Sequence, residues 1–252
     1  TFKGYSKCVN TIQFSPFTGG RYLCSGSDDN TIRLWDVETS KSLHVFNGHS
    51  CYVWCVEFSP LQNNSKDTNK IGVVGGAGYT ICSGSNDKTI RLWDIENTKQ
   101  LAVFNGHESR VSSVKYSRNE TSIVGGNMIC SGSGDKTVRL WDIRTGKQIH
   151  IFKGHTSDVL AVEYLPSEND SSDTNIICSG SNDNTIRFWD IRANKQLHEI
   201  KGFDDNTEIR SFEFVPFDQD LKNNEKSKKN TKDCCGYSLC YGSGNGLIRV
   251  LG

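Results

Sequence analysis

The chain has 252 residues, which suits one repeat domain or two ordinary domains. Its 29 basic and 29 acidic residues cancel to a formal net charge of zero, so no overall field favours nucleic acid or an anionic membrane. No stretch approaches the roughly 18 apolar residues of a membrane span, and no charged-then-apolar leader opens the chain. We therefore expect an intracellular protein, cytoplasmic or nuclear, although a start at Thr1 without Met leaves an upstream segment open.

A short sequence recurs along the chain and predicts a β-hairpin in each copy. The clearest copy is Ser-Gly-Ser-Asn-Asp-Lys-Thr-Ile-Arg-Leu-Trp-Asp at residues 83–94. A strand ending in Cys-Ser-Gly-Ser, a polar turn around Asp87 and a second strand rich in β-branched residues are typical of a hairpin. In the second strand Ile90 and Leu92 point to one face and Trp93 to the other, so both faces of the sheet need cover. In chain order the copies are residues 25–36, 83–94, 131–142, 179–190 and the eroded 241–252.

A second signature precedes each hairpin and predicts two further strands. In its best copy one strand ends at Phe46-Asn-Gly-His, a turn follows, and the next strand carries Val53, Val56 and Phe58 before Ser-Pro. Each unit thus supplies four strands. Tyr5 stands at the His position in the first unit and Phe203 in the fifth. The five units span approximately residues 4–36, 48–94, 106–142, 154–190 and 202–252.

These paired signatures resemble the WD-repeat family of β-propellers over essentially the whole chain. The resemblance implies an all-β fold, with four-stranded antiparallel blades around a central channel in one domain of residues 1–252. It also implies a ring whose last blade is completed by the strand before the first Gly-His, which here is only residues 1–3. Rings in this family commonly have about seven blades. We therefore expect either a five-bladed ring or part of a larger one, with the first and last units acting as caps or decayed copies.

The long insertions fall at one topological position, between the strand that ends at Ser-Pro and the strand that leads into Cys-Ser-Gly-Ser. We expect them all on the rim opposite the Gly-His turns. The last one, residues 217–233, contains five lysines among acidic residues and is predicted to be a solvated loop. A lysine-rich arm for an acidic partner is the alternative.

The spacing of the cysteines predicts that they are buried, reduced residues of a protein in a reducing compartment. Five of the ten stand at the same repeat position before Ser-Gly-Ser, too far apart in successive blades to form disulfides. The others lack CxxC spacing. We therefore expect neither a metal site nor a cofactor. The five equivalent residues are Cys24, Cys82, Cys130, Cys178 and Cys240.

One set of residue types raises the question of catalysis. His49, Ser83 and Asp87 are the types that a nucleophile, its base and an orienting carboxylate require. The same set recurs in the next two units, which argues against an active site; a hydrolase is the remote alternative. The family resemblance implies instead that each set joins the strand tryptophan in a structural hydrogen-bond tetrad. The implied tetrads are His49-Ser83-Asp87-Trp93, His107-Ser131-Asp135-Trp141 and His155-Ser179-Asp183-Trp189.

The first and fifth units break this tetrad, so we expect their blades to be the weakest and the seam between them to open. The first unit has Tyr5 beside its Ser, Asp and Trp. The fifth has Tyr241, Asn245 and Leu251 at the last three positions.

The innermost strand of each unit carries the candidate partner-binding residues. Because Val53, Val56 and Phe58 are packing positions, the out-of-phase Trp54 should face the channel mouth. An aromatic residue there suits a peptide anchor or a stacked arginine or methyl-lysine, and the resemblance implies the same. The alternative is that Trp54 only plugs the channel. The candidates are the aligned, variable residues Asn10, Trp54, Ser112, Leu160 and Arg210, with Tyr52, Arg110 and Asp158 on the same face.

The sequence thus predicts a non-enzymatic scaffold that binds a peptide or partner domain on its Gly-His face. The alternative is a substrate-recognition subunit of a ubiquitin ligase, or an arginine- or lysine-reading subunit of a chromatin complex. The expected partner is a protein or peptide, with neither nucleic acid nor membrane involved, and the oligomeric state stays open.

Overall fold

The computed structural model describes residues 1–16, 18–59, 80–117, 128–166, 175–202, 207–216 and 237–251. Apart from one short 3-10 turn, η1 (Thr18–Gly20), its regular elements are all β-strands. The predicted insertions at 61–78, 118–127 and 217–233, and nearly all of 167–175, lie outside the described residues. Within the described part of the chain, no helix has the length and apolar character needed to cross a membrane.

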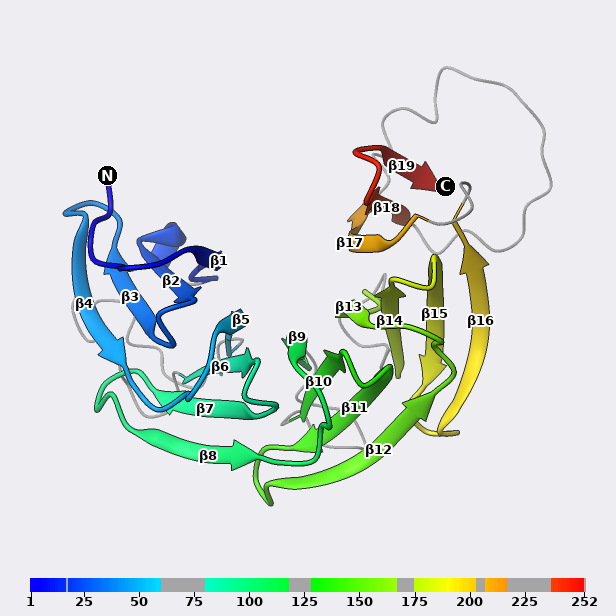
Figure 1. Cartoon of the computed structure of the whole chain (residues 1–252), viewed down its shortest axis with the longest axis horizontal. Coiled ribbons are helices and arrows are strands. Elements are labelled where there is room, and N and C mark those ends of the chain that lie inside the picture. The colour runs from blue at the N-terminus through cyan, green and yellow to red at the C-terminus, as the bar shows by residue number, and fades with distance from the viewer. Residues whose placement is uncertain are drawn as a thin grey trace.

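The strands form five sheets, each an antiparallel meander of neighbours in sequence. Figure 1 shows these sheets side by side around a common centre, as the blades of a propeller, with the first strand of each blade innermost. The blades are β1 (Val9–Phe14), β2 (Tyr22–Ser27), β3 (Ile32–Asp36) and β4 (Lys41–Phe46); β5 (Val53–Phe58), β6 (Thr80–Ser85), β7 (Ile90–Asp94) and β8 (Gln100–Phe104); β9 (Val111–Tyr116), β10 (Met128–Ser133), β11 (Thr137–Asp142) and β12 (Lys147–Lys153); β13 (Val159–Tyr164), β14 (Ile176–Ser181), β15 (Thr185–Asp190) and β16 (Lys195–Lys201); and β17 (Ile209–Pro216), β18 (Tyr237–Ser243) and β19 (Ile248–Leu251).

The last blade has three strands in its described residues, because β16, the strand that ends at the Gly202 turn of the fifth unit, lies in the fourth blade. In the other blades the outermost strand follows the Trp-Asp pair, whereas in this unit Leu251 and Gly252 hold those positions. Figure 1 shows the five blades as an open arc, with the first and last blades on either side of the opening. The arrangement matches the expected propeller architecture without a closed ring among the described residues.

The hydrophobic core lies between successive blades. One face of β3, with Ile32 and Leu34, packs with Val53 and Val56 of β5, and all four side chains are buried. Gly84 shows how closely the sheets approach, because a Cβ there would lie 2.6 Å from a methyl carbon of Val111 in the next blade. The Cys-Ser-Gly-Ser motif therefore uses glycine for packing between blades.

The cysteines of the repeat position behave as small apolar residues where a following blade covers them. Cys24, Cys82, Cys130 and Cys178 are buried, and burial raises the pKa of the Cys24, Cys82 and Cys130 thiols. Cys240 is only partly buried, contrary to the expectation, because no described blade packs on its face of the last sheet.

Candidate functional site

Each central blade carries the four residues of the tetrad in hydrogen-bond contact. In the second blade Trp93 Nε1 donates to Ser83 Oγ at 2.8 Å, and His49 Nε2 lies 2.8 Å from the same oxygen. His49 Nδ1 lies 2.8 Å from Asp87 Oδ2. The third and fourth blades repeat these contacts at 2.7 to 2.8 Å, through His107-Ser131-Asp135-Trp141 and His155-Ser179-Asp183-Trp189.

The electrostatics of the tetrad assign its protons. Burial lowers the pKa of His49, although the neighbouring Asp87 acts in the opposite direction. Burial acts to raise the pKa of Asp87, but hydrogen bonds from His49 and Thr89 outweigh it and hold that pKa well below its usual range. The carboxylate is therefore ionised and accepts from Nδ1–H, so Nε2 accepts from the Ser83 hydroxyl.

The serine hydroxyl makes its hydrogen bonds to other residues of the tetrad. Ser83 accepts from Trp93, donates to His49 and is fully buried. Gly48 completes the site, because a Cβ there would lie 2.8 Å from Trp93 Cη2. The tetrad thus ties the Gly-His turn to the hairpin and leaves no hydroxyl exposed for attack on a substrate.

The first and fifth blades lack the histidine imidazole that joins serine to aspartate in the central blades. In the first blade the Tyr5 hydroxyl lies 2.7 Å from both Ser25 Oγ and its carbonyl oxygen, and Trp35 Nε1 donates to Ser25 Oγ at 2.7 Å. In the fifth blade the buried Tyr241 hydroxyl has no hydrogen-bond partner within the described ranges. Phe203, predicted at the His position, lies outside the described residues.

Each of the five channel-mouth candidates lies at a register shift between the first two strands of its blade. In the second blade, for example, Val53 pairs with Ser85 and Cys55 with Gly84, which leaves Trp54 as the extra residue of a β-bulge. A bulge re-aims the side chain of the extra residue. The sequence identified these residues as out of phase with the packing, and the bulge is the backbone feature that places them. The five are Asn10, Trp54, Ser112, Leu160 and Arg210.

Several candidates contact one another across neighbouring blades. The Arg110 guanidinium lies 5.4 Å from the centre of the Trp54 ring and forms a 2.9 Å ion pair with Asp158 of the next blade. Asn10 Nδ2 donates to Asp28 at 2.7 Å and to the Val53 carbonyl at 3.1 Å. These contacts join the first blade to the second, and the second to the fourth through the third.

The remaining candidates differ in accessibility. Tyr52 is 40% exposed, with the Lys7 ammonium 5.6 Å from its ring centre. The exposed Arg210 forms an ion pair with Glu208. Leu160 is half-buried. Trp54 Nε1 and Ser112 Oγ are buried and lack a hydrogen-bond partner among the described residues. The mouth therefore presents aromatic surface beside charges of both signs.

A second set of residues toward the channel was missed by the sequence analysis. It lies three positions after each bulge residue, toward the Ser-Pro end of the innermost strands. Lys115 Nζ lies 3.2 Å from Glu57 and 3.1 Å from Glu163, and so joins three successive blades. Burial acts to lower the pKa of Lys115, but the two carboxylates outweigh it and raise that pKa. The variation between repeats that identified Trp54 would also have found these positions: Gln13, Glu57, Lys115, Glu163 and Glu213.

No metal site emerges from the part of the chain that the structure describes. Its His, Cys, Asp and Glu side chains do not form any group of three or more that could hold an ion.

Comparison with known proteins places these features in a family. The family model "WD domain, G-beta repeat" matches residues 1–36, 40–94, 98–142 and 146–190. The chain is 30% identical over 125 residues to a guanine nucleotide-binding protein subunit beta of Schizosaccharomyces pombe, covering 39% of this chain and 41% of that protein. It is 34% identical over 119 residues to the WD40 repeat-containing protein HOS15 of Arabidopsis thaliana, covering 47% and 18%. It is 37% identical over 161 residues to cell division control protein 4 of Saccharomyces cerevisiae, covering 44% and 21%.

The chain therefore spans less than half the length of each of these relatives. The family-model match covers most of the chain. Each matched segment after the first begins with the outermost strand of one blade and continues through the three inner strands of the next, so repeats and blades correspond with an offset of one strand. The fifth blade, which has no complete tetrad, lies beyond the matched ranges. From this correspondence we conclude that the chain belongs to the WD-repeat family of β-propellers.

Proposed function

We propose that this propeller, a protein-interaction scaffold like its relatives, binds a short peptide or a partner domain on its Gly-His face. This face carries the turns of Gly48-His49, Gly106-His107 and Gly154-His155. One observation carries the proposal: the bulge residues differ from blade to blade, while the tetrads that hold them repeat. Variable side chains on a constant frame are what a binding site on a repeat scaffold requires.

The chemistry of the channel mouth supports a peptide ligand. Tyr52 offers an exposed ring, and the Arg110–Asp158 pair provides a donor and an acceptor that are each about one-third accessible. Aromatic and arginine side chains are the residue types that most often anchor protein partners. A hollow of about 470 Å³ lies on the same face, with Glu108, Lys136 and Lys153 among its lining residues. A peptide with both apolar and charged side chains would match this surface.

We propose that the protein acts without catalysis. The only His-Ser-Asp sets that the sequence singled out are the tetrads, whose serines are buried and already donate and accept hydrogen bonds. A nucleophile must reach its substrate, which these hydroxyls do not. The proposed partner is a protein inside the cell, in the nucleus or the cytoplasm, rather than nucleic acid or membrane.

The alternative roles, in a ubiquitin ligase or in a chromatin complex that reads arginine or lysine, depend on Trp54. In this structure the Arg110 guanidinium already lies against the Trp54 ring. A ligand cation that stacked on the same face of the ring would have to displace Arg110. The exposed Tyr52 and Arg210 fit a general peptide-binding surface without such a displacement.

A matched pull-down tests the proposal. The parent, a Trp54→Ala/Arg210→Ala double variant and a Leu101→Ala/Leu197→Ala control, altered on the exposed outer strands, are compared after circular dichroism confirms equal melting. We expect protein partners to be lost from the mouth variant alone. An identical partner list for all three proteins would contradict binding at the mouth and leave Trp54 as a channel plug.

A further inference from the structure

A pocket of about 510 Å³ opens between the fourth and fifth blades, away from the channel mouth. Most of its residues come from the Ser-Pro ends of the innermost strands: Pro166 follows β13, and Pro216 ends β17. Tyr237, at the start of the adjacent β18, also lines it. Leu160 and Arg210, the mouth residues of the same two strands, do not line it. The volume is within the roughly 300–1,000 Å³ of typical ligand sites. The pocket is therefore a separate candidate from the Gly-His face.

The charges of the pocket favour a cation. Lys115 is the one basic residue in its lining, and its ammonium is already paired with Glu163 inside the pocket and with Glu57 beside it. Three carboxylates against one ammonium leave this group with a net charge of −2. Glu213 is exposed, and no described residue pairs with its carboxylate. An incoming donor would thus find an acceptor that the described residues leave unsatisfied.

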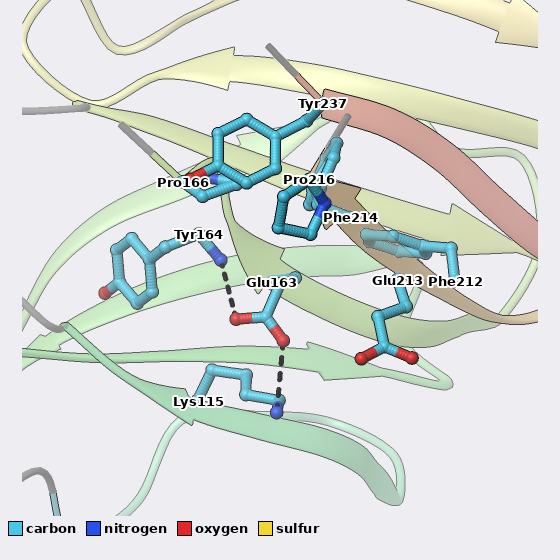
Figure 2. Close-up of a pocket in the computed structure, with 9 residues that line it drawn as sticks. All are labelled: Lys115, Glu163, Tyr164, Pro166, Phe212, Glu213, Phe214, Pro216 and Tyr237. Atoms are coloured by element: carbon cyan, nitrogen blue, oxygen red, sulfur yellow. Dashed lines mark hydrogen bonds and ion pairs between the residues drawn. The ribbon is translucent and has the colours of Figure 1, made fainter. Parts of the chain in front are cut away.

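The walls of the pocket are aromatic. Phe212, Phe214 and Tyr237 line it. The two phenylalanine rings pack edge to face, with 6.0 Å between their centres. Figure 2 shows Phe214, Pro216 and Tyr237 gathered on one side of the pocket, with the carboxylates of Glu163 and Glu213 directed to the side of Lys115. A ligand there would meet flat apolar surface together with the Glu213 carboxylate, which no described residue pairs.

We propose that this pocket binds an arginine side chain of a partner peptide at the Ser-Pro end of the channel. A guanidinium is planar, so it can lie on a ring face while its N–H groups donate to Glu213. Lysine offers a compact ammonium without the flat surface, and it fits these walls less well. The propeller would then contact partners at both ends of its channel, through a mixed surface at the Gly-His face and an arginine pocket at the opposite end.

The test uses capped pentapeptides, Gly-Gly-Arg-Gly-Gly and its citrulline and lysine counterparts, titrated by NMR into the whole chain. Citrulline keeps the planar shape of arginine and removes its charge. We expect the arginine peptide to bind, the citrulline peptide to bind about ten-fold more weakly, and Glu213→Gln to weaken arginine binding by about ten-fold. Glu208→Gln, one residue before the same strand and at its Gly-His end, is the matched control and should leave the affinity for this pocket unchanged.

Four outcomes of these titrations would contradict the proposal. Absence of arginine-peptide binding to the parent, equal binding of the citrulline peptide, or an unchanged affinity of Glu213→Gln would each reject the pocket as an arginine site. Equal binding of the lysine peptide would reject the assignment of arginine. Because Glu213 lies away from the channel mouth, these outcomes are independent of the Trp54 pull-down.

Discussion

The three central blades and the two end blades use nearly the same motif in different surroundings. In the central blades the innermost strand is covered by the preceding blade, and Val56 is 5% exposed. Ile12, at the equivalent position of the first blade, is 61% exposed. At the other end of the arc Ile248 is 81% exposed, whereas its counterpart Ile90 is fully buried. Neighbouring blades, rather than the sheet itself, bury these side chains.

The hydrogen bonds around the repeated serine also differ between the central blades and the end blades. The central blades join turn and hairpin through an imidazole between serine and aspartate. The first blade uses the Tyr5 hydroxyl instead, and the fifth leaves Tyr241 without a partner among the described residues. Since a buried polar group without a partner is costly, we expect the end blades to unfold at lower denaturant concentration than the centre.

The largest effect should come from the tryptophan of a central tetrad. Trp141→Ala should lower the free energy of unfolding by roughly 3–5 kcal/mol, because it removes a large buried aromatic ring. Leu251→Ala changes the same position of the fifth blade, where the side chain is only half-buried, and should cost less. Urea unfolding measures both. A Trp141→Ala protein that melts within a degree or two of the parent would contradict the tetrad's structural role.

A second comparison changes the same repeat position of the innermost strand in a central blade, where it is buried, and in the first blade, where it is exposed. Val114→Thr places a hydroxyl in the core between blades and should lower the free energy of unfolding by roughly 1–3 kcal/mol. Ile12→Thr alters the exposed counterpart in the first blade and should stay within about 0.5 kcal/mol of the parent. Equal losses in the two variants would show that the first blade is covered in solution.

The tetrads should also make the central blades sensitive to pH. The folded state lowers the pKa of His49 and His107, so below the unfolded value of about 6.5 the unfolded chain binds more protons. The stability contributed by these residues is therefore complete above that pH and declines as the pH falls toward 5. His107→Tyr gives the third blade the residue of the first, and should lower stability at pH 7 while making the loss between pH 7 and 5 shallower. Urea titrations at the two pH values measure this loss. If His107→Tyr loses as much stability between pH 7 and 5 as the parent, the result would argue against a neutral imidazole in the folded state.

The smallest effect concerns the hairpin turn. Lys136 has a left-handed backbone with φ of 70°, which asparagine adopts more readily than lysine. Asn30 holds the equivalent position of the first blade with φ of 72°. Lys136→Asn should raise the free energy of unfolding by a few tenths of a kcal/mol, and Asn30→Lys should lower it by a similar amount. Paired thermal melts measure the difference, and a change of the same sign in both variants would reject the backbone explanation.

The candidate site was partly readable from the sequence. Repeat alignment alone identified Trp54 and its equivalents, because packing positions stay constant while the intervening residue varies. It did not reveal that Arg110 covers Trp54, or that Lys115 lies between Glu57 and Glu163. These pairs are separated by nearly fifty residues or more in the chain, so only the side-by-side placement of innermost strands brings them together.

The sequence by itself determined the hairpins, the order of strands within each blade and the family, because these follow from local turn chemistry and from a repeat that returns along the chain. The tertiary structure decided which repeated residues are buried, how the arc stands open, and which charges meet toward the channel. Identical motifs receive different exposures because burial depends on the adjacent blade, and charge pairing depends on distances between strands that no local pattern encodes.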